Sequence, residues 1–319
     1  MKEFKTIDEQ IELLQKRNLA IDSIEEAKAF LLTQNYYNII NGYGNYFPHD
    51  GDNYINNPNF KEISKLYTFE REIKQAIFQA IIDAETHLKS IFSYRFAELY
   101  QNKPYAYLDI NCYDCADQKK RLNIVQNISN LGKLISKKEK FGNNSIAHYI
   151  KKHNDVPIWV LAGHLEFGDL KYMLINSTTS LQNSVARDLS SFIKVNINTT
   201  EIFPPETMMS FIENINDIRN ICAHNNRLLD FKCRRDSKFW NPLHSKYQIN
   251  KETPRSTVYS VILSLQCFLN QVEYGTLHNK LLKRITNLDN ALKTITGNDI
   301  LCKLGFPNDW HKNTKKITY

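Results

Sequence analysis

The sequence has few of the residues that turn a chain: only 10 glycines and 9 prolines among 319 residues. β-Sandwiches and barrels contain many tight turns, and glycine and proline supply the backbone conformations that such turns require. The scarcity of both argues against a fold of many short strands. We therefore expect an all-α fold built from long helices.

Long apolar segments are also missing. No run of about 18 apolar residues occurs, the length that a membrane-spanning helix requires. Residues Met1 to Lys5 lead directly into polar, amphipathic sequence and do not resemble a signal peptide. Both absences lead us to expect a cytoplasmic protein.

The six cysteines include one CxxC pair, Cys112 and Cys115, and no second pair at zinc-site spacing. Cys233 and His244 are further possible ligands, but their spacing is not that of a zinc finger. We expect reduced thiols with no metal and no other cofactor, and a structural zinc is the alternative.

The chain carries a mild excess of positive charge, formally +7. An excess of this size is compatible with binding a phosphate backbone but does not require it.

Apolar residues recur at helical spacing along most of the chain. The longest such helix is expected from about 60 to 100, and a second strong helix from 206 to about 229, after Pro204 and Pro205. Further helices are expected at 7–17, 23–33, 118–136, 145–152, 157–175, 181–193, 256–273 and 276–295, with a possible break at 166–168. We divide the chain into an N-terminal helical segment, 1–55, and a helical domain, 56–319, with an inserted loop at 231–255.

The helix expected at 206–229 carries an unusual polar face. Asn220 and His224 are four residues apart and therefore lie one above the other, and Arg227 is expected one turn beyond His224. The long side chain of Arg219 can swing towards the same groove. An Arg followed by a His after four to six residues is expected about once by chance in this composition, but the Asn directly after the Arg lowers that expectation to about 0.03. A surface Arg beside a capping or core His is the alternative interpretation.

These side chains suit RNA cleavage without a metal. His224 can take a proton from the ribose 2′-hydroxyl or give one to the leaving 5′-oxygen. Arg219 can hold the phosphate and stabilise its developing charge, and Asn220 can orient the histidine or contact a phosphate oxygen. The products would be a 2′,3′-cyclic phosphate and a 5′-hydroxyl, and DNA would not react because it lacks the 2′-hydroxyl.

The segment at 231–248 alternates cations with aromatic residues, a pattern typical of single-stranded RNA binding. Its candidate RNA contacts are Arg234, Arg235, Lys238 and Trp240, together with Arg227. The alternative is an ordinary surface loop whose Trp240 packs into the core.

Residues 219–228, RNICAHNNRL, resemble the RNxCAHxxRL signature of Abi-like abortive-infection proteins (the AbiD/AbiF group), which belong to the HEPN superfamily. Three further stretches resemble other family segments: 35–43 the NYY…GY segment, 157–168 the P-x-W…FG segment and 304–310 the LG-P-xxW ending. Asn38 and Asn41 depart from the family pattern, which weakens any phosphate-binding role for the N-terminal motif.

The resemblance implies a HEPN-type helical core and endoribonuclease activity in phage defence or as a toxin, with Arg219 and His224 catalytic. It also implies RNA as a partner, as substrate and, as in some relatives, as a small structured regulatory RNA. HEPN nucleases generally pair two Arg/His motifs in one composite site, and this chain has one such motif, so we expect a homodimer.

Two other functions remain open: a non-catalytic module that holds a structured RNA, and a regulatory protein that senses a partner. Glu70 and Arg71 are interpreted as a local surface pair. With Glu166, they are possible supporting residues of the site.

Overall fold

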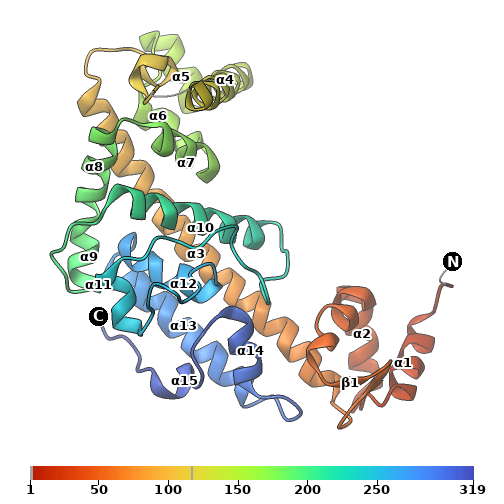
Figure 1. Ribbon diagram of the computed structural model, residues 1–319. Coiled ribbons are helices and arrows are strands. Elements are labelled where there is room, and N and C mark those ends of the chain that lie inside the picture. Colours follow the sequence, from red (N-terminus) through yellow and green to blue (C-terminus); the bar gives the residue numbers. More distant parts are fainter. Residues whose placement is uncertain (1–2, 116–117) are drawn as a thin grey trace. The chain divides into compact units, whose positions relative to one another are not determined.

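The computed structural model describes residues 3–115 and 118–319, whose regular secondary structure is almost entirely helical (Figure 1). Met1 and Lys2, which the sequence analysis considered, lie outside the described residues. Within the described part, strand pairing is confined to two isolated bridges and one hairpin, β1 His49–Asp50 with β2 Asn53–Tyr54. The predicted all-α class is therefore confirmed. No helix in these residues is both long enough and apolar enough to cross a membrane.

The chain forms two compact units. Unit 1 contains Met1–Ile77, Arg227–Phe231 and Gly275–Thr318, and unit 2 contains Phe78–Asn226, Lys232–Tyr274 and Tyr319. Two long helices, α3 Phe60–Leu99 and α13 Gln271–Asp289, contribute residues to both.

Unit 1 is built from short elements around the first part of α3 and most of α13. These elements are α1 Ile7–Lys16, α2 Ile24–Gln34, the π-helical turn η1 Tyr37–Asn41, the 3₁₀ turn η2 Gly44–Tyr46, the hairpin, α14 Gly297–Leu304 and α15 Trp310–Asn313.

Capping residues in the sequence fix several of these helix ends. Thr6 begins α1 with a capping box, and the Oγ of Ser23 accepts the Glu26 N–H at the start of α2. At the other end of unit 1, Gly305 ends α14 in the left-handed conformation, with φ of 81°. This explains the glycine of the LG-P-xxW ending. The tryptophan of that ending, Trp310, is buried against Phe306, with their ring centroids 5.0 Å apart.

The centre of unit 1 is a buried carboxylate. Glu70 is 0% exposed, so the predicted surface pair with Arg71 is wrong. Its Oε1 accepts the backbone N–H groups of Leu228 and Leu229 at 2.7 and 2.8 Å, and its Oε2 accepts the hydroxyl of Tyr43. Lys74, one turn further along α3, lies 3.4 Å from Oε2. One side chain thus joins the NYY…GY segment to the residues that end the RNxCAHxxRL signature.

A second contact joins the same two segments. Arg227 Nη1 donates to the carbonyl of Gly42 at 2.8 Å. A Cβ at position 42 would lie 2.1 Å from the carbonyl oxygen of Asn38, so this turn leaves no space for any residue but glycine. The Gly42-Tyr43 pair is therefore explained by packing and hydrogen bonding within unit 1.

Unit 2 surrounds helix α10, Pro205–Ala223 (Figure 1). Its other elements are η3 Ala106–Leu108, η4 Ile110–Cys112, α4 Gln118–Phe141, α5 Ser145–His153, α6 Ile158–Leu161, η5 Ala162–His164, α7 Phe167–Asn176, α8 Thr179–Asp188, α9 Ser190–Asn196, α11 Asn241–His244, η6 Ser245–Tyr247, α12 Val258–Ser264 and η7 Leu265–Cys267. Helix α10 packs against α7, α8 and α12, and every residue of α12 is buried.

The sequence predicted the positions of most helices, but several predicted helices are divided. The helix expected at 157–175 breaks into α6, η5 and α7, and α7 begins at Phe167, within the suspected break. The helices expected at 181–193 and 256–273 are each divided as well. Local apolar periodicity cannot locate such breaks, because packing of neighbouring elements decides them.

We predict that Glu70→Ala will lower the free energy of unfolding by about 3–5 kcal/mol, since it removes the buried carboxylate that two N–H groups, a hydroxyl and the Lys74 ammonium share. Urea denaturation of the wild type and the variant measures this loss of unfolding free energy. Glu72→Ala is the matched control. Glu72 lies on the same helix and pairs with Arg284 at 3.1 Å near the surface, so its loss should cost only about 0–1 kcal/mol. Equal effects for the two variants would contradict the role assigned to Glu70.

Candidate functional site on helix α10

Helix α10 has one apolar and one polar face. Met208, Phe211, Ile212, Ile215 and Ile218 are all fully buried, as their helical spacing predicted. Pro205 occupies the first turn, where its missing N–H costs no hydrogen bond. Since the apolar face is fixed in the core of unit 2, the polar face with Arg219 and Asn220 lies at its surface.

The helix ends at Ala223, six residues earlier than predicted. His224 is the C-cap, and Asn225 adopts the left-handed conformation with φ of 52°. The Asn225 N–H donates to the carbonyl of Cys222 at 3.2 Å, and the Asn226 N–H to that of Ile221 at 3.0 Å. This is the Schellman arrangement, in which asparagine can replace the usual glycine. The Asn225-Asn226 pair was a sequence signal for this ending.

Arg219 and Asn220 form a half-buried pair. Arg219 Nη1 lies 3.4 Å from Asn220 Oδ1, a long hydrogen bond. Arg219 Nε is buried and has no hydrogen-bond partner in the described part of the chain. A buried guanidinium N–H without an acceptor is unfavourable, and a bound anion would satisfy it.

His224 is exposed at the end of the helix. Its backbone N–H donates to the carbonyl of Asn220 at 3.0 Å, so the peptide is fixed by the helix. The Asn220 side chain accepts the long hydrogen bond from Arg219, so its predicted role of orienting the imidazole stays a prediction. Within residues 3–115 and 118–319 no hydrogen bond holds the His224 imidazole, which lies at the end of the helix that carries the Arg219–Asn220 pair.

The cationic loop after the signature runs back along α10. Cys233 Sγ lies 3.7 Å from the carbonyl of Asn214, and the Lys238 N–H donates to Ser210 Oγ at 2.9 Å. On its other side the loop is held by Arg255, whose Nε donates to the carbonyl of Ser237 at 2.8 Å. These contacts place Arg234, Arg235 and Lys238 beside α10 in unit 2, and all three are exposed.

Asp217 anchors this loop, and the sequence analysis did not identify it. The Arg234 N–H donates to Asp217 Oδ2 at 3.2 Å, while the Arg234 guanidinium lies 3.9 Å from Oδ1 and is 90% exposed. Asp217 is one turn before Asn220 on the polar face, which was the available signal. It fixes the loop backbone and leaves the arginine side chain in solvent.

Trp240 and Arg227, two of the predicted RNA contacts, do not lie with the exposed cations of the loop. Trp240 is 5% exposed and packs on Phe203, with centroids 5.0 Å apart, so it cannot stack on a base and that prediction is wrong. Arg227 does not continue the helical face, because α10 has already ended, and it belongs to unit 1.

Cys233 and His244, the further zinc ligands that the sequence offered, are both buried in unit 2. Burial raises the pKa of the Cys233 thiol to about 12 and lowers the pKa of His244 to about 4. No group of three or more His, Cys, Asp or Glu side chains with the geometry of a metal site occurs within residues 3–115 and 118–319.

Comparison with known families agrees with these motifs. The family model described as Abi-like protein matches residues 29–230, well over half of the chain. The chain therefore belongs to the Abi-like family, and this membership supports a role in abortive infection. No curated protein and no solved structure matches it.

The ending of α10 gives a second prediction. Asn225→Val should destabilise the protein by about 1–2 kcal/mol, because a β-branched residue is strained at positive φ. Asn225→Gly should be neutral or stabilising at the same position. Thermal unfolding of both variants measures the difference. Indistinguishable melting temperatures would show that the left-handed ending does not constrain the chain.

Proposed function

We propose that this protein is an endoribonuclease of abortive infection that cleaves RNA through its 2′-hydroxyl without a metal, like the HEPN nucleases that it resembles. The observation that carries the proposal is that Arg219 and Asn220 lie on the polar face of α10 and exposed His224 at its end, in a chain of the Abi-like family.

Each group has a chemical role in this proposal. The scissile phosphate binds the guanidinium of Arg219, whose buried Nε then gains an acceptor. The amide of Asn220 holds a non-bridging oxygen. The exposed imidazole of His224 takes the proton of the 2′-hydroxyl or delivers one to the leaving 5′-oxygen. Arg219 also stabilises the charge of the phosphorane as it forms.

Arg234, Arg235 and Lys238 would guide the strand along α10. The contacts of the loop with Ser210 and Asp217 hold its backbone in place, so these three cations lie beside the polar face that carries the motif. Exposed cations along a fixed line attract a phosphate backbone at little entropic cost.

A second candidate function is RNA binding without cleavage. One observation favours it: in the described part of the chain no hydrogen bond orients the imidazole of His224, whereas a catalytic histidine is usually held by a partner group. In a homodimer, a second copy of the motif would supply the groups that a single chain lacks around His224 and so complete the site. We therefore propose that two chains meet across a two-fold axis at α10.

We predict that His224→Ala and Arg219→Ala will each lower RNA cleavage in EDTA by at least about 10²-fold. Growth arrest on expression should disappear with the activity. End-group analysis of the wild-type products should find 2′,3′-cyclic phosphates. His224 is exposed, so circular dichroism and melting temperature should be unchanged in its variant.

The outcome separates the two functions. Cleavage that persists in both variants would contradict the nuclease proposal. RNA binding with no new cyclic ends in the wild-type protein would establish the non-catalytic alternative.

Removing the loop cations gives a third kind of test. Arg234→Gln, Arg235→Gln and Lys238→Gln together should reduce the slope of log affinity against log salt for single-stranded RNA by about 2, at roughly 0.7 for each lost phosphate contact. The control replaces Lys133, Lys137 and Lys140 by Gln, which removes the same charge from the exposed surface of α4. Equal slopes in the two triple variants would contradict the proposed path.

The dimer makes its own prediction. Specific activity should fall on dilution in parallel with the dissociation measured by analytical ultracentrifugation, because one chain supplies only half of the site. A monomer with full specific activity at the assay concentration would disprove the composite site.

A further inference from the structure

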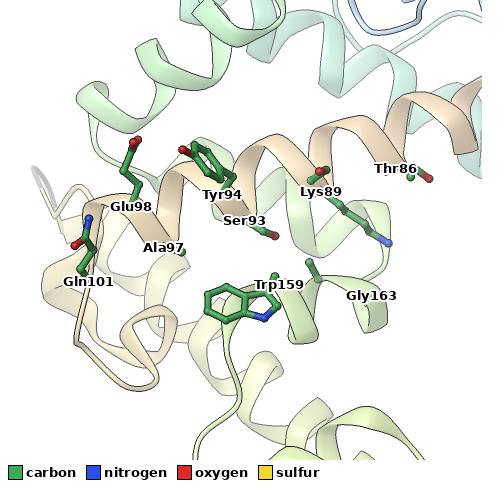
Figure 2. A pocket seen from close by; sticks show the side chains of 11 residues that line it. Thr86, Lys89, Ser93, Tyr94, Ala97, Glu98, Gln101, Trp159 and Gly163 are labelled. Carbon is green, nitrogen blue, oxygen red and sulfur yellow. The ribbon is translucent and has the colours of Figure 1, made fainter.

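Unit 2 contains a groove that the motif does not use. Its volume is about 890 Å³, within the range of about 300–1,000 Å³ usual for small-molecule sites. One wall is a face of α3 and the other is formed by α6 and η5 (Figure 2). Small residues keep it open: Ser90, Ser93 and Ala97 on α3, and Ala162 and Gly163 opposite. We call it the Trp159 groove.

Trp159 gives the groove its distinctive surface. It is 60% exposed, whereas Trp240 and Trp310 are 5% and 8% exposed. Figure 2 shows its indole lying across from the Ser93 and Ala97 side of α3. A large aromatic ring in solvent at the edge of a cavity is costly unless a ligand covers it, and a flat ring favours a flat partner.

A buried hydroxyl provides an independent sign of a ligand. Ser93 is 3% exposed, its Oγ has no hydrogen-bond partner in the described residues, and Figure 2 shows it pointing to the side where Trp159 lies. Buried hydroxyl groups are nearly always paired. A ligand with a polar edge, stacked on the indole, would satisfy this group.

The charges of the groove indicate what kind of ligand fits. Lys89 lies 2.7 Å from Glu85 and donates to the carbonyl of Leu165 at 2.6 Å. Glu98 is paired with Arg95 at 2.7 Å. Both charged residues of the lining are therefore neutralised by protein partners. The groove suits a neutral planar group with hydrogen-bonding edges better than it suits a phosphate.

We propose that the Trp159 groove binds a nucleobase, stacked on Trp159 with its polar edge towards Ser93. Thr86 and Gln101 also line the groove, but they lie towards its opposite ends (Figure 2) and are too far apart to meet the edge of one base. The base belongs either to a free nucleotide or to a single-stranded RNA, and only the second source rests on the proposed function.

The test uses two probes on the full chain. The first is each of AMP, GMP, CMP and UMP. The second is a single-stranded RNA octamer that carries 2-aminopurine and 2′-O-methyl riboses, so that it cannot be cleaved. Tryptophan quenching reports the first and 2-aminopurine fluorescence the second. Trp159→Ala should weaken binding at least about tenfold, and Trp159→Phe should restore part of it.

Two further variants examine the rest of the groove. Ser93→Ala should reduce discrimination among the four bases, because it removes the hydroxyl that meets the polar edge. Ala97→Phe should block the space. The control is Tyr172→Ala, which removes an exposed aromatic residue of unit 2 that does not line the groove. Trp159 is mostly exposed, so its variants should fold even if Ala97→Phe does not.

The outcomes are decisive. Binding of mononucleotides that depends on Trp159 identifies a free nucleotide, and binding of the octamer alone identifies an RNA strand. Unchanged affinity of both probes for Trp159→Ala, or no binding of either to the wild type, would overturn the proposal. Binding should survive His224→Ala, so loss of cleavage alone affects only the proposed function.

Discussion

The buried carboxylate of Glu70 is the constraint on which the family motifs of unit 1 depend. A charge with no exposure is tolerated only when several donors meet it, and here two peptide N–H groups, a tyrosine hydroxyl and an ammonium do so. Two of these donors, the N–H groups of Leu228 and Leu229, lie more than 150 residues from Glu70 in the sequence. The Gly42-Tyr43 and Arg227-Leu228 pairs of the family motifs are therefore explained by the architecture, and no chemistry has to be assigned to them.

Residues that are explained by their contacts within the protein can be set aside in the same way, which leaves few residues for chemistry. Once Arg227 is engaged with Gly42 and Trp240 with the core, the polar face of α10 keeps Arg219, Asn220 and His224, with Arg234, Arg235 and Lys238 beside it. Asp217 and Ser210 fix the loop through its backbone, which leaves the cationic side chains in solvent. A backbone held by hydrogen bonds with solvent-exposed cations is suited to a ligand whose sequence varies but whose phosphates recur.

The sequence predicted what local signals determine. Apolar spacing located α3 and the buried face of α10, because both depend on residues within a few turns. It did not predict the burial of Glu70, and it offered the burial of Trp240 only as the alternative interpretation, because both depend on donors and rings far along the chain. The early end of α10 was only partly predictable from the local sequence. Asn225-Asn226 was a local signal for it, but apolar Leu228 and Leu229 fit the helical period and suggested that the helix continued.

Several buried polar atoms of unit 2 are unpaired in the described residues, and two of them lie at the proposed sites. Arg219 Nε and Ser93 Oγ both lack partners in the described residues, one beside the motif and the other in the Trp159 groove. Their chemistry differs: a guanidinium N–H is best satisfied by an anion, and a hydroxyl in a charge-neutral groove by the edge of an uncharged ring. An RNA strand offers both, through its phosphates and its bases. In the free protein, each of these buried groups costs free energy because it has no hydrogen-bond partner within the described residues. RNA would remove one cost with a phosphate and the other with a base, so one class of ligand is consistent with both sites.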